Sequence, residues 1–224
     1  MIIDCLMNLP LLYWASEQEG DPRFSMIAKQ HTKTALKYLL RPDGSCNHIV
    51  ELDAYTGEFI DNPGGQGYEK GSSWSRGQAW AVYGMALAYR YTREEEYLDA
   101  AKRAAHYFIS NAALTGYVSL IDFRAPAEPV YYDTTATACA ACGLLELSEY
   151  VNVYEKELYV QSAFRMLEGM AERFTDFDTA EDGILLYGSA KYHRENDREV
   201  PIIYGDYFLL ELLLRFLDCD FMLW

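Results

Sequence analysis

Two kinds of helical segment alternate along this chain, and the alternation limits the folds that it can adopt. One kind is apolar on almost every side: "IIDCLMNLPLLYWA", "GQAWAVYGMALAY", "TTATACAACGLLEL" and "GDYFLLELLLRF". The other kind is amphipathic: "PRFSMIAKQHTKTALKYLL", "EEEYLDAAKRAAHYFI" and "KELYVQSAFRMLEGMAERF". A helix that is apolar all round is buried, whereas an amphipathic helix covers a surface. The sequence therefore predicts an inner and an outer layer of paired helices, repeating at intervals of roughly 60 to 70 residues.

The helical period predicts about seven helices. They are Ile3–Gln18, Arg23–Leu40, Ser75–Tyr91, Arg93–Asn111, Thr134–Tyr150, Glu155–Phe174 and Asp206–Leu217. A short hairpin with a turn at Thr56–Gly57 is expected within 46–60, and another within the long loop 178–201. The segment 61–71 is a glycine-rich loop, and 116–132 is a connection with an extended part. Together these elements predict an all-α fold, an α/α toroid whose mouth is formed by loops at one end of the inner helices.

Length and charge exclude several classes of partner. The chain has 224 residues, which fits one domain or a large part of one, and half of them are hydrophobic, enough for a sizeable core. The formal net charge is −15, so we expect no nucleic-acid partner and no binding to an anionic membrane. Apolar runs are too short to span a membrane. An anionic small substrate is compatible with this charge, because it needs only a local arginine or lysine.

The five cysteines predict a reducing compartment, and hence a cytoplasmic protein, because an odd number without a short disulfide framework is typical there. Cys139 and Cys142 have C-x-x-C spacing, but no second cysteine or histidine pair accompanies them. We interpret them as buried core residues and expect no metal or cofactor. The N-terminal stretch lacks the basic region of a signal peptide.

Aromatic residues make up 15% of the chain, and 19 of them are tyrosines. Such a composition is compatible with a sugar-binding cleft and equally with an aromatic-rich helical core.

Asp4 is the first candidate for catalysis. Apolar residues flank it in a segment that we expect to be buried. Burying a carboxylate is costly unless the group is paired or functional, and burial raises the pKa of a carboxyl group toward the range of a general acid. A catalytic role and structural pairing remain equally good interpretations. Asp133 and Asp206 also stand at expected helix starts, where an N-cap role explains them.

The entrance of the helix at 75–91 holds several candidate binding residues. Arg76 can hold a carboxylate in bidentate fashion, and Trp74 and Trp80 offer flat faces for a sugar ring. The alternative is that both tryptophans belong to the core and that Arg76 pairs with a structural acid. His48 lies in the hairpin near the same mouth, although a lone histidine is more often surface or core. The glycines around Gln66 allow close approach to a ligand, but a plain turn would look identical.

The chain resembles the unsaturated glucuronyl hydrolases, glycoside hydrolase family 88, along nearly its whole length and in the right order. The resemblance rests on "IIDCLMNLPLLYWA", "KGSSWSRGQAWAVYGMALAYRYT", "EPVYYDTTATACAACGLLEL" and "YGDY". The "WSRGQAW" block is specific, since the related unsaturated rhamnogalacturonyl hydrolases usually have "RGNGW" there. Membership implies an α/α six-hairpin barrel. It also implies release of 4,5-unsaturated glucuronic acid from oligosaccharides that lyases produce from glycosaminoglycans.

The resemblance implies an unusual chemistry. In this family an aspartic acid protonates C4 of the C4=C5 double bond, and its carboxylate then activates the water that adds to C5. The hemiketal that results opens, and the glycosidic bond breaks. The matching acid is Asp4. The matching pocket residues are His48, Gln66, Arg76 and Trp80, with Trp74 a further candidate; Arg76 would meet the uronate carboxylate.

The resemblance covers only the C-terminal part of a six-hairpin barrel, about three and a half hairpins. We therefore expect residues 1–224 to be the C-terminal part of one catalytic domain, with an N-terminal part missing. The expected consequences are self-association, or association with the missing half. An inactive fragment and a rhamnogalacturonyl hydrolase are the alternative readings. The segment 193–207 lacks the serine- and lysine-bearing pattern that some members use for sulfated sugars, so the sequence leaves the substrate preference open.

Overall fold

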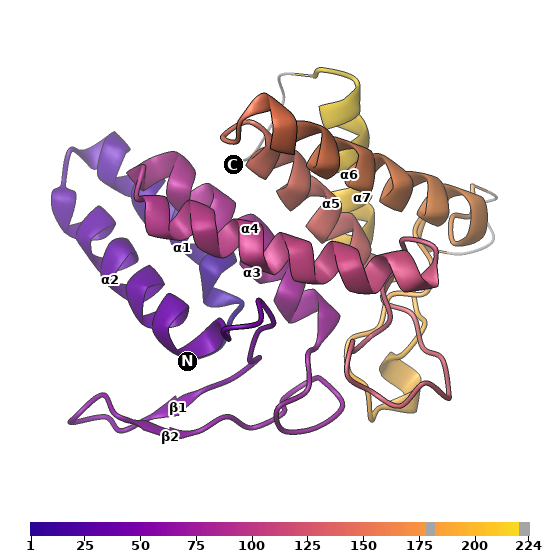
Figure 1. The fold of residues 1–224 in the computed structure, drawn as a ribbon, viewed down its shortest axis with the longest axis horizontal. Helices are drawn as coiled ribbons and strands as arrows, with labels where there is room; N and C mark the ends of the chain where they lie inside the picture. Colours follow the sequence, from indigo (N-terminus) through magenta and orange to yellow (C-terminus); the bar gives the residue numbers. More distant parts are fainter. Residues whose placement is uncertain (178–181, 220–224) are drawn as a thin grey trace.

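The computed structural model of the chain describes residues 1–177 and 182–219. In this described part, seven α-helices account for most of the fold, so the predicted all-α class is confirmed (Figure 1). The helices are α1 (Cys5–Glu19), α2 (Pro22–Leu39), α3 (Ser75–Thr92), α4 (Glu95–Ala112), α5 (Thr134–Ser148), α6 (Val153–Arg173) and α7 (Ile203–Phe216). Two short 3-10 helices, η1 (Ala113–Thr115) and η2 (Glu195–Asp197), lie in the connections.

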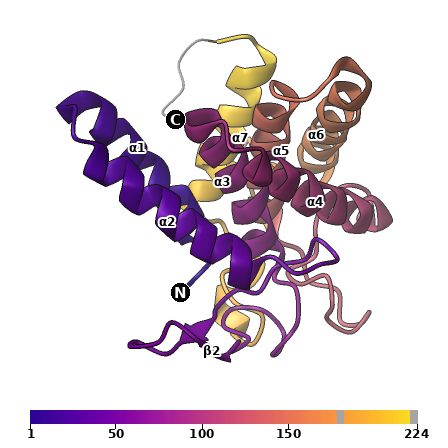
Figure 2. The same cartoon turned by 60° about the vertical axis from the view of Figure 1, so that its left-hand side comes forward.

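The helices form the two layers that the sequence predicts. Helices α1, α3, α5 and α7 lie side by side in that order, and α2, α4 and α6 each pack on the inner helix that precedes them in the chain (Figures 1 and 2). Most residues of α3 and almost all residues of α5 are buried, whereas the outer helices bury one face. Successive inner helices begin at Cys5, Ser75, Thr134 and Ile203, which confirms the repeat.

Two glycines allow the inner helices to approach one another closely. A Cβ atom on Gly84 of α3 would lie 2.5 Å from the Cβ of Leu6 in α1. A Cβ atom on Gly143 of α5 would lie 2.8 Å from the Cα of Tyr83 in α3. Carbon atoms that are not bonded prefer 3.5–4.0 Å, so any larger residue would push these helices apart. The apolar, small-residue character of the inner segments thus has a direct packing cause.

The row of inner helices has two open flanks, on α1 and α7. Leu11 and Trp14 of α1 are 65% and 52% exposed, and Leu210 of α7 is 49% exposed. Burial on all sides, which the apolar sequences of the inner helices predict, is therefore confirmed for α3 and α5 but wrong for these two flanks. The reason is that α1 and α7 each have only one inner-layer neighbour among the described residues.

The long connections gather at one end of the inner helices, at the bottom of Figure 1. The expected hairpin is present as the antiparallel strands β1 (Glu51–Leu52) and β2 (Phe59–Asp61), joined by 53–58. An isolated bridge joins Trp74 to Asp122, and the N–H of Tyr192 donates to the carbonyl of Gln66, so three connections contact one another there. The first four residues of the predicted loop 178–201 lie outside the described residues.

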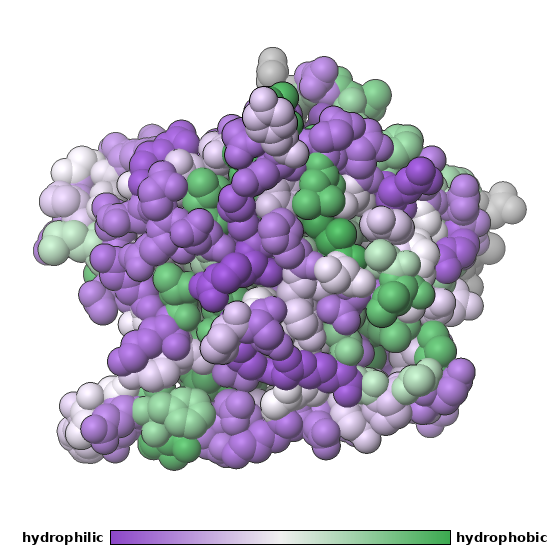
Figure 3. Space-filling model, in the orientation of Figure 1, coloured by the Kyte–Doolittle hydropathy of each residue, from purple (hydrophilic) through white to green (hydrophobic). Residues whose placement is uncertain are grey.

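The visible surface is largely hydrophilic. Hydrophobic residues lie in several small groups on this face, one of them over the β1–β2 hairpin, where Phe59 and Ile60 are exposed (Figure 3). Among the helices that the structure describes, none combines the length and the apolar character needed to cross a bilayer.

Candidate active site

Asp4 and His48 face each other at the start of α1. Asp4 immediately precedes the helix, yet its side chain makes no capping hydrogen bond. Its Oδ2 lies 3.6 Å from Nε2 of His48, and within the described residues neither atom has a hydrogen-bond partner. The Asp4 side chain is 37% exposed, so the expectation of a buried acid is wrong for this chain. Asp4 stands at the open end of the apolar helix and not inside it.

The surroundings of His48 assign its tautomer. The backbone N–H of Gln66 donates to Nδ1 of His48 at 2.9 Å, so Nδ1 is the acceptor. A neutral imidazole with an acceptor at Nδ1 carries its proton on Nε2, the nitrogen that faces Asp4. Gly65 has a φ of +65°, and a Cβ atom there would lie 2.1 Å from Nδ1. The glycine-rich loop is therefore built around this ring.

The two tryptophans occupy different places. The ring of Trp74 packs 4.3 Å from that of His48, and Trp74 is buried. Trp80 lies one helical turn beyond Arg76 on α3, and its ring is 5.7 Å from Phe208 of α7. The indole nitrogen of each is buried without a hydrogen-bond partner among the described residues. Buried donors of this kind are normally satisfied, so both can still donate to a ligand or to a further protein segment.

Arg76 forms a buried ion pair with Asp133. Its Nη1 lies 3.2 Å from Oδ2 of Asp133, and the side chains are 1% and 0% exposed. The guanidinium also lies 4.8 Å from the ring of Trp74 and 5.7 Å from that of Tyr204. Burial raises the pKa of Asp133, and the positive charge of Arg76 opposes this shift. Of the two interpretations that the sequence left open for Arg76, the structure shows the pairing with an acid; contact with a uronate stays a prediction.

Both helix-start aspartates make contacts that the sequence did not reveal. Asp133 caps α5 by accepting a hydrogen bond from the N–H of Ala136, as predicted, but it also holds Arg76. Asp206 is not an N-cap, because α7 begins three residues earlier, at Ile203. Its carboxylate instead accepts hydrogen bonds from the N–H groups of Ile184 and Leu185 and ties the preceding loop to the helix.

The carbonyl oxygen of Ala190 joins two of the predicted residues. It accepts hydrogen bonds from Nε2 of Gln66 at 2.5 Å and from Nη2 of Arg76 at 3.1 Å. Sequence reasoning missed this contact, and no sequence signal could have found it, since any residue carries a backbone carbonyl. The structure thus brings Asp4, His48, Gln66, Trp74 and Arg76 into one connected group, with Trp80 one turn deeper on α3.

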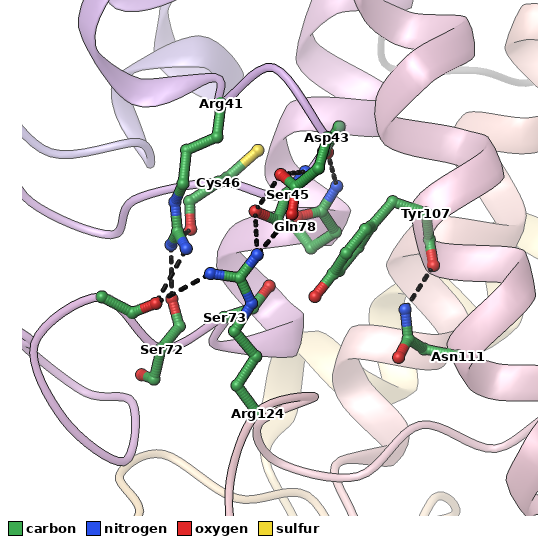
Figure 4. A network of polar contacts seen from close by, with 12 residues as sticks. Arg41, Asp43, Ser45, Cys46, Ser72, Ser73, Gln78, Tyr107, Asn111 and Arg124 are labelled. Carbon is green, nitrogen blue, oxygen red and sulfur yellow. Dashed lines mark hydrogen bonds and ion pairs between the residues drawn. The ribbon is translucent and has the colours of Figure 1, made fainter.

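Two arginines fix the loops beside this group (Figure 4). Arg41 and Arg124 both donate to the carbonyl of Gly71, at 2.8 and 3.0 Å. Arg41 also donates to the carbonyls of Cys46 and Ser72, and Arg124 is paired with Asp43 at 2.5 Å. These arginines are engaged with the protein itself. Gln78 of the "WSRGQAW" block is likewise structural, because its Nε2 donates to the carbonyls of Gly44 and Ala104.

Acid–base chemistry is what this arrangement can perform. A carboxylate that caps no helix faces an imidazole whose proton is held toward it, beside a buried indole. Within the residues that the structure describes, no three histidine, cysteine or acidic side chains are grouped as metal ligands. Cys139 and Cys142 are buried in the core with free thiols.

Comparison with known proteins finds unsaturated glucuronyl hydrolases and unsaturated chondroitin disaccharide hydrolases among the relatives of this chain. No family model matches the chain. The chain is 37% identical over 219 residues to the unsaturated glucuronyl hydrolase of Bacillus sp. strain GL1. The aligned residues cover 96% of this chain and 58% of the relative. It is 34% identical over 221 residues to the unsaturated chondroitin disaccharide hydrolase of Streptococcus agalactiae, covering 96% of this chain and 55% of that protein.

The fold agrees with these similarities. The crystal structure of the Bacillus sp. GL1 unsaturated glucuronyl hydrolase superposes with a TM-score of 0.89 at 38% identity, covering 96% of this chain and 58% of the other. An unsaturated glucuronyl hydrolase variant from Streptococcus agalactiae, solved in complex with dGlcA-GalNAc6S, gives a TM-score of 0.85 at 33% identity, with coverage of 96% and 58%. The chain therefore has the fold of part of an α/α toroid, and it spans only about half the length of its curated relatives.

Proposed function

We propose, from this likeness to unsaturated glucuronyl hydrolases over 96% of its own length, that the chain carries the acid–base centre of a hydrolase for oligosaccharides that end in an unsaturated uronate. The observation that carries the proposal is the Asp4–His48 pair. The Asp4 carboxylate is not used as a helix cap, and it lies 3.6 Å from the imidazole nitrogen that holds a proton.

In the proposed reaction, Asp4 in its acid form donates a proton to C4 of the C4=C5 double bond. The resulting carboxylate takes a proton from water as the water oxygen bonds to C5, which regenerates the acid. The product is a hemiketal at C5, which opens and releases the rest of the oligosaccharide. The Nε2–H of His48 points at the Asp4 carboxylate and orients it through this exchange. The partial exposure of Asp4 allows substrate and water to reach it.

The remaining predicted residues would form the substrate pocket. Trp74 and Trp80 would wall the sugar with their indole faces and donate from their unpartnered nitrogens. Gln66 would present its side-chain oxygen, because its amide nitrogen is bound to Ala190. Arg76 would meet the uronate carboxylate only by sharing its charge with Asp133, so it would bind the substrate less strongly than an unpaired arginine.

The same proposal covers the extent of the domain. Residues 1–224 would form the C-terminal part of one α/α-barrel domain, and the exposed flanks of α1 and α7 would contact the rest of that barrel or a second copy. The relatives do not favour a rhamnogalacturonyl hydrolase. A chain that has no turnover without the remaining barrel is the alternative that the coverage of 55–58% keeps open.

The purified chain should be incubated with an unsaturated chondroitin disaccharide while the absorbance of the conjugated double bond is followed. Loss of absorbance that requires Asp4 would support the proposal. If the chain consumes only pectin-derived unsaturated disaccharides, the substrate assignment is wrong. If neither disaccharide is consumed or bound, the chain has no activity by itself.

A further inference from the structure

Asp122 is a buried carboxylate to which the proposed reaction assigns no role. It is 1% exposed and lies in the connection between η1 and α5. The structure shows no ion pair to it within the described residues. A buried negative charge is costly unless other groups compensate it, so its hydrogen bonds must stabilise it.

Four donors surround the Asp122 carboxylate. Oδ1 accepts from the N–H groups of Ser73 at 3.0 Å and Arg124 at 2.9 Å. Oδ2 accepts from the N–H of Tyr68 at 3.0 Å and from the hydroxyl of Ser72 at 2.7 Å. Three of the four donors lie on the segment 68–73, at its two ends. The carboxylate thus closes this segment into a loop of fixed shape.

The two ends of that loop lead directly to the two groups that hold His48. Two residues before Tyr68 is Gln66, whose N–H donates to Nδ1 of His48. The residue after Ser73 is Trp74, whose ring packs on the imidazole and whose backbone forms a bridge with Asp122 itself. One carboxylate therefore fixes both the hydrogen bond and the stacking surface of the imidazole.

We propose that Asp122 is a positioning residue, which holds His48 in the tautomer with its proton on Nε2 by fixing the loop 66–74. It contacts neither Asp4 nor a substrate and acts only through Gln66 and Trp74. Its catalytic meaning rests on the proposed function, but its effect on the imidazole does not. Buried backbone N–H groups need hydrogen-bond acceptors, and a carboxylate offers an acceptor at both of its oxygens. The amide of asparagine has the same shape, but it replaces one of these acceptors with an NH₂ donor.

The test is the tautomer state of His48 in the whole 224-residue chain, read from imidazole ¹⁵N chemical shifts above pH 7.5. The chain has only four histidines, so a His48→Gln variant identifies the His48 signal. We expect Asp122→Asn to lower the ratio of the Nε2–H to the Nδ1–H tautomer by about fivefold to tenfold, the factor that corresponds to the loss of one ordinary hydrogen bond. The imidazoles of His31 and His106 should not change. His193 is not a reference, because its Nε2 contacts the carbonyl of Tyr68, whose N–H donates to Asp122.

A matched control is Asp53→Asn. Asp53 also accepts two backbone N–H bonds, from Tyr55 and Thr56, but it lies in the turn of the hairpin and touches no residue that contacts His48. This variant should leave the His48 signal unchanged. A shift of equal size in the control would show that the effect is not specific to Asp122 and would overturn the proposal.

Ser72→Ala serves if Asp122→Asn does not fold. It removes the hydroxyl donor to Oδ2, together with the acceptor of the Glu69 N–H, and leaves the three backbone donors to Asp122 in place. A smaller shift of the His48 signal in the same direction would support the proposal. An unchanged His48 signal in a folded Asp122→Asn chain, or in Ser72→Ala if that is the only folded variant, would refute it. Because no substrate is used, failure of the proposed hydrolase activity would leave this result intact.

Discussion

At the scale of single residues, the Asp4 carboxylate faces His48 and is not used to cap its helix, which leaves it free for proton transfer. Asp4 occupies a helix N-terminus, where an aspartate usually accepts hydrogen bonds from the first turn. Here it makes none, and its nearest polar partner is the imidazole nitrogen 3.6 Å away. His48 in turn is held by a backbone N–H and an indole ring.

The first prediction concerns Asp4. An amide can neither give a proton to C4 nor take one from water, so Asp4→Asn should lower kcat by at least the factor of about 10²–10⁴ that general acid–base steps contribute. Substrate binding should be nearly unchanged, because the side chain keeps its size. Initial rates from the loss of double-bond absorbance, with affinities measured by calorimetry, test this. Turnover close to that of the parent protein would exclude Asp4 as the acid; Asp53→Asn is the control.

The second prediction concerns the Arg76–Asp133 pair. Arg76→Ala leaves a fully buried carboxylate without its cation, so the free energy of unfolding should fall by about 3–5 kcal/mol. Urea unfolding followed by circular dichroism measures this. Replacing an exposed ion-paired residue, with Arg165→Ala, should change stability by at most about 1 kcal/mol. If Arg76→Ala is as stable as the parent chain, the buried pair is not required for stability. That result would favour a role of Arg76 in substrate binding.

At the scale of secondary-structure elements, polar contacts join neighbouring helices of the outer layer. On the outer side, α4 and α6 meet where the hydroxyl of Tyr159 lies 3.0 Å from Nε2 of His106. The two rings are stacked 5.8 Å apart. Desolvation by the surrounding residues lowers the pKa of His106, and the positive charge of Lys102 lowers it further.

The third prediction follows from that lowered pKa. Near pH 6 the unfolded chain holds more protons at residue 106 than the folded chain, since an unperturbed histidine has a pKa of about 6.5. The stability that neutral His106 contributes is therefore complete above about pH 6.5 and is lost as the pH falls below it. Melting temperatures of the parent chain and His106→Gln at pH 7.5 and 5.5 should show a steeper acid decrease in the parent. Identical slopes would mean that His106 does not contribute.

At the scale of the whole molecule, the row of inner helices has apolar flanks at both ends. Leu11 and Trp14 on α1, and Leu210 on α7, each expose about half of their surface or more. Exposed apolar patches of this kind mark interaction sites or aggregation risks. The structural relatives contain further chain, and this chain covers 58% of the Bacillus protein.

The fourth prediction is that the isolated chain associates with itself through these flanks. Size-exclusion chromatography with light scattering should show oligomers, and Trp14→Gln combined with Leu210→Gln should shift the chain toward the monomer. Leu114→Gln, which changes a leucine that is 85% exposed on η1, is the control and should have no effect. A parent chain that is monodisperse and monomeric would show that the flanks do not need a partner.

The sequence alone determined the layers, the helices to within about three residues at each end, and the identities of the candidate site residues. Helical periodicity is local, so it can be read without knowing the fold, and the "WSRGQAW" block and its neighbours carry the resemblance by themselves. The sequence also supplied both interpretations of Arg76, as a substrate clamp and as the partner of an acid.

Only the tertiary structure decided which groups meet. The pairing of Arg76 with Asp133, the carbonyl of Ala190 between Gln66 and Arg76, and the anchoring of a loop by Asp206 all join residues far apart in the chain. It also placed Asp4 at an open helix end, partly exposed, where the apolar sequence around it predicted burial. Periodicity reports which face of a helix is buried, but the distance between two side chains depends on how the helices and loops pack.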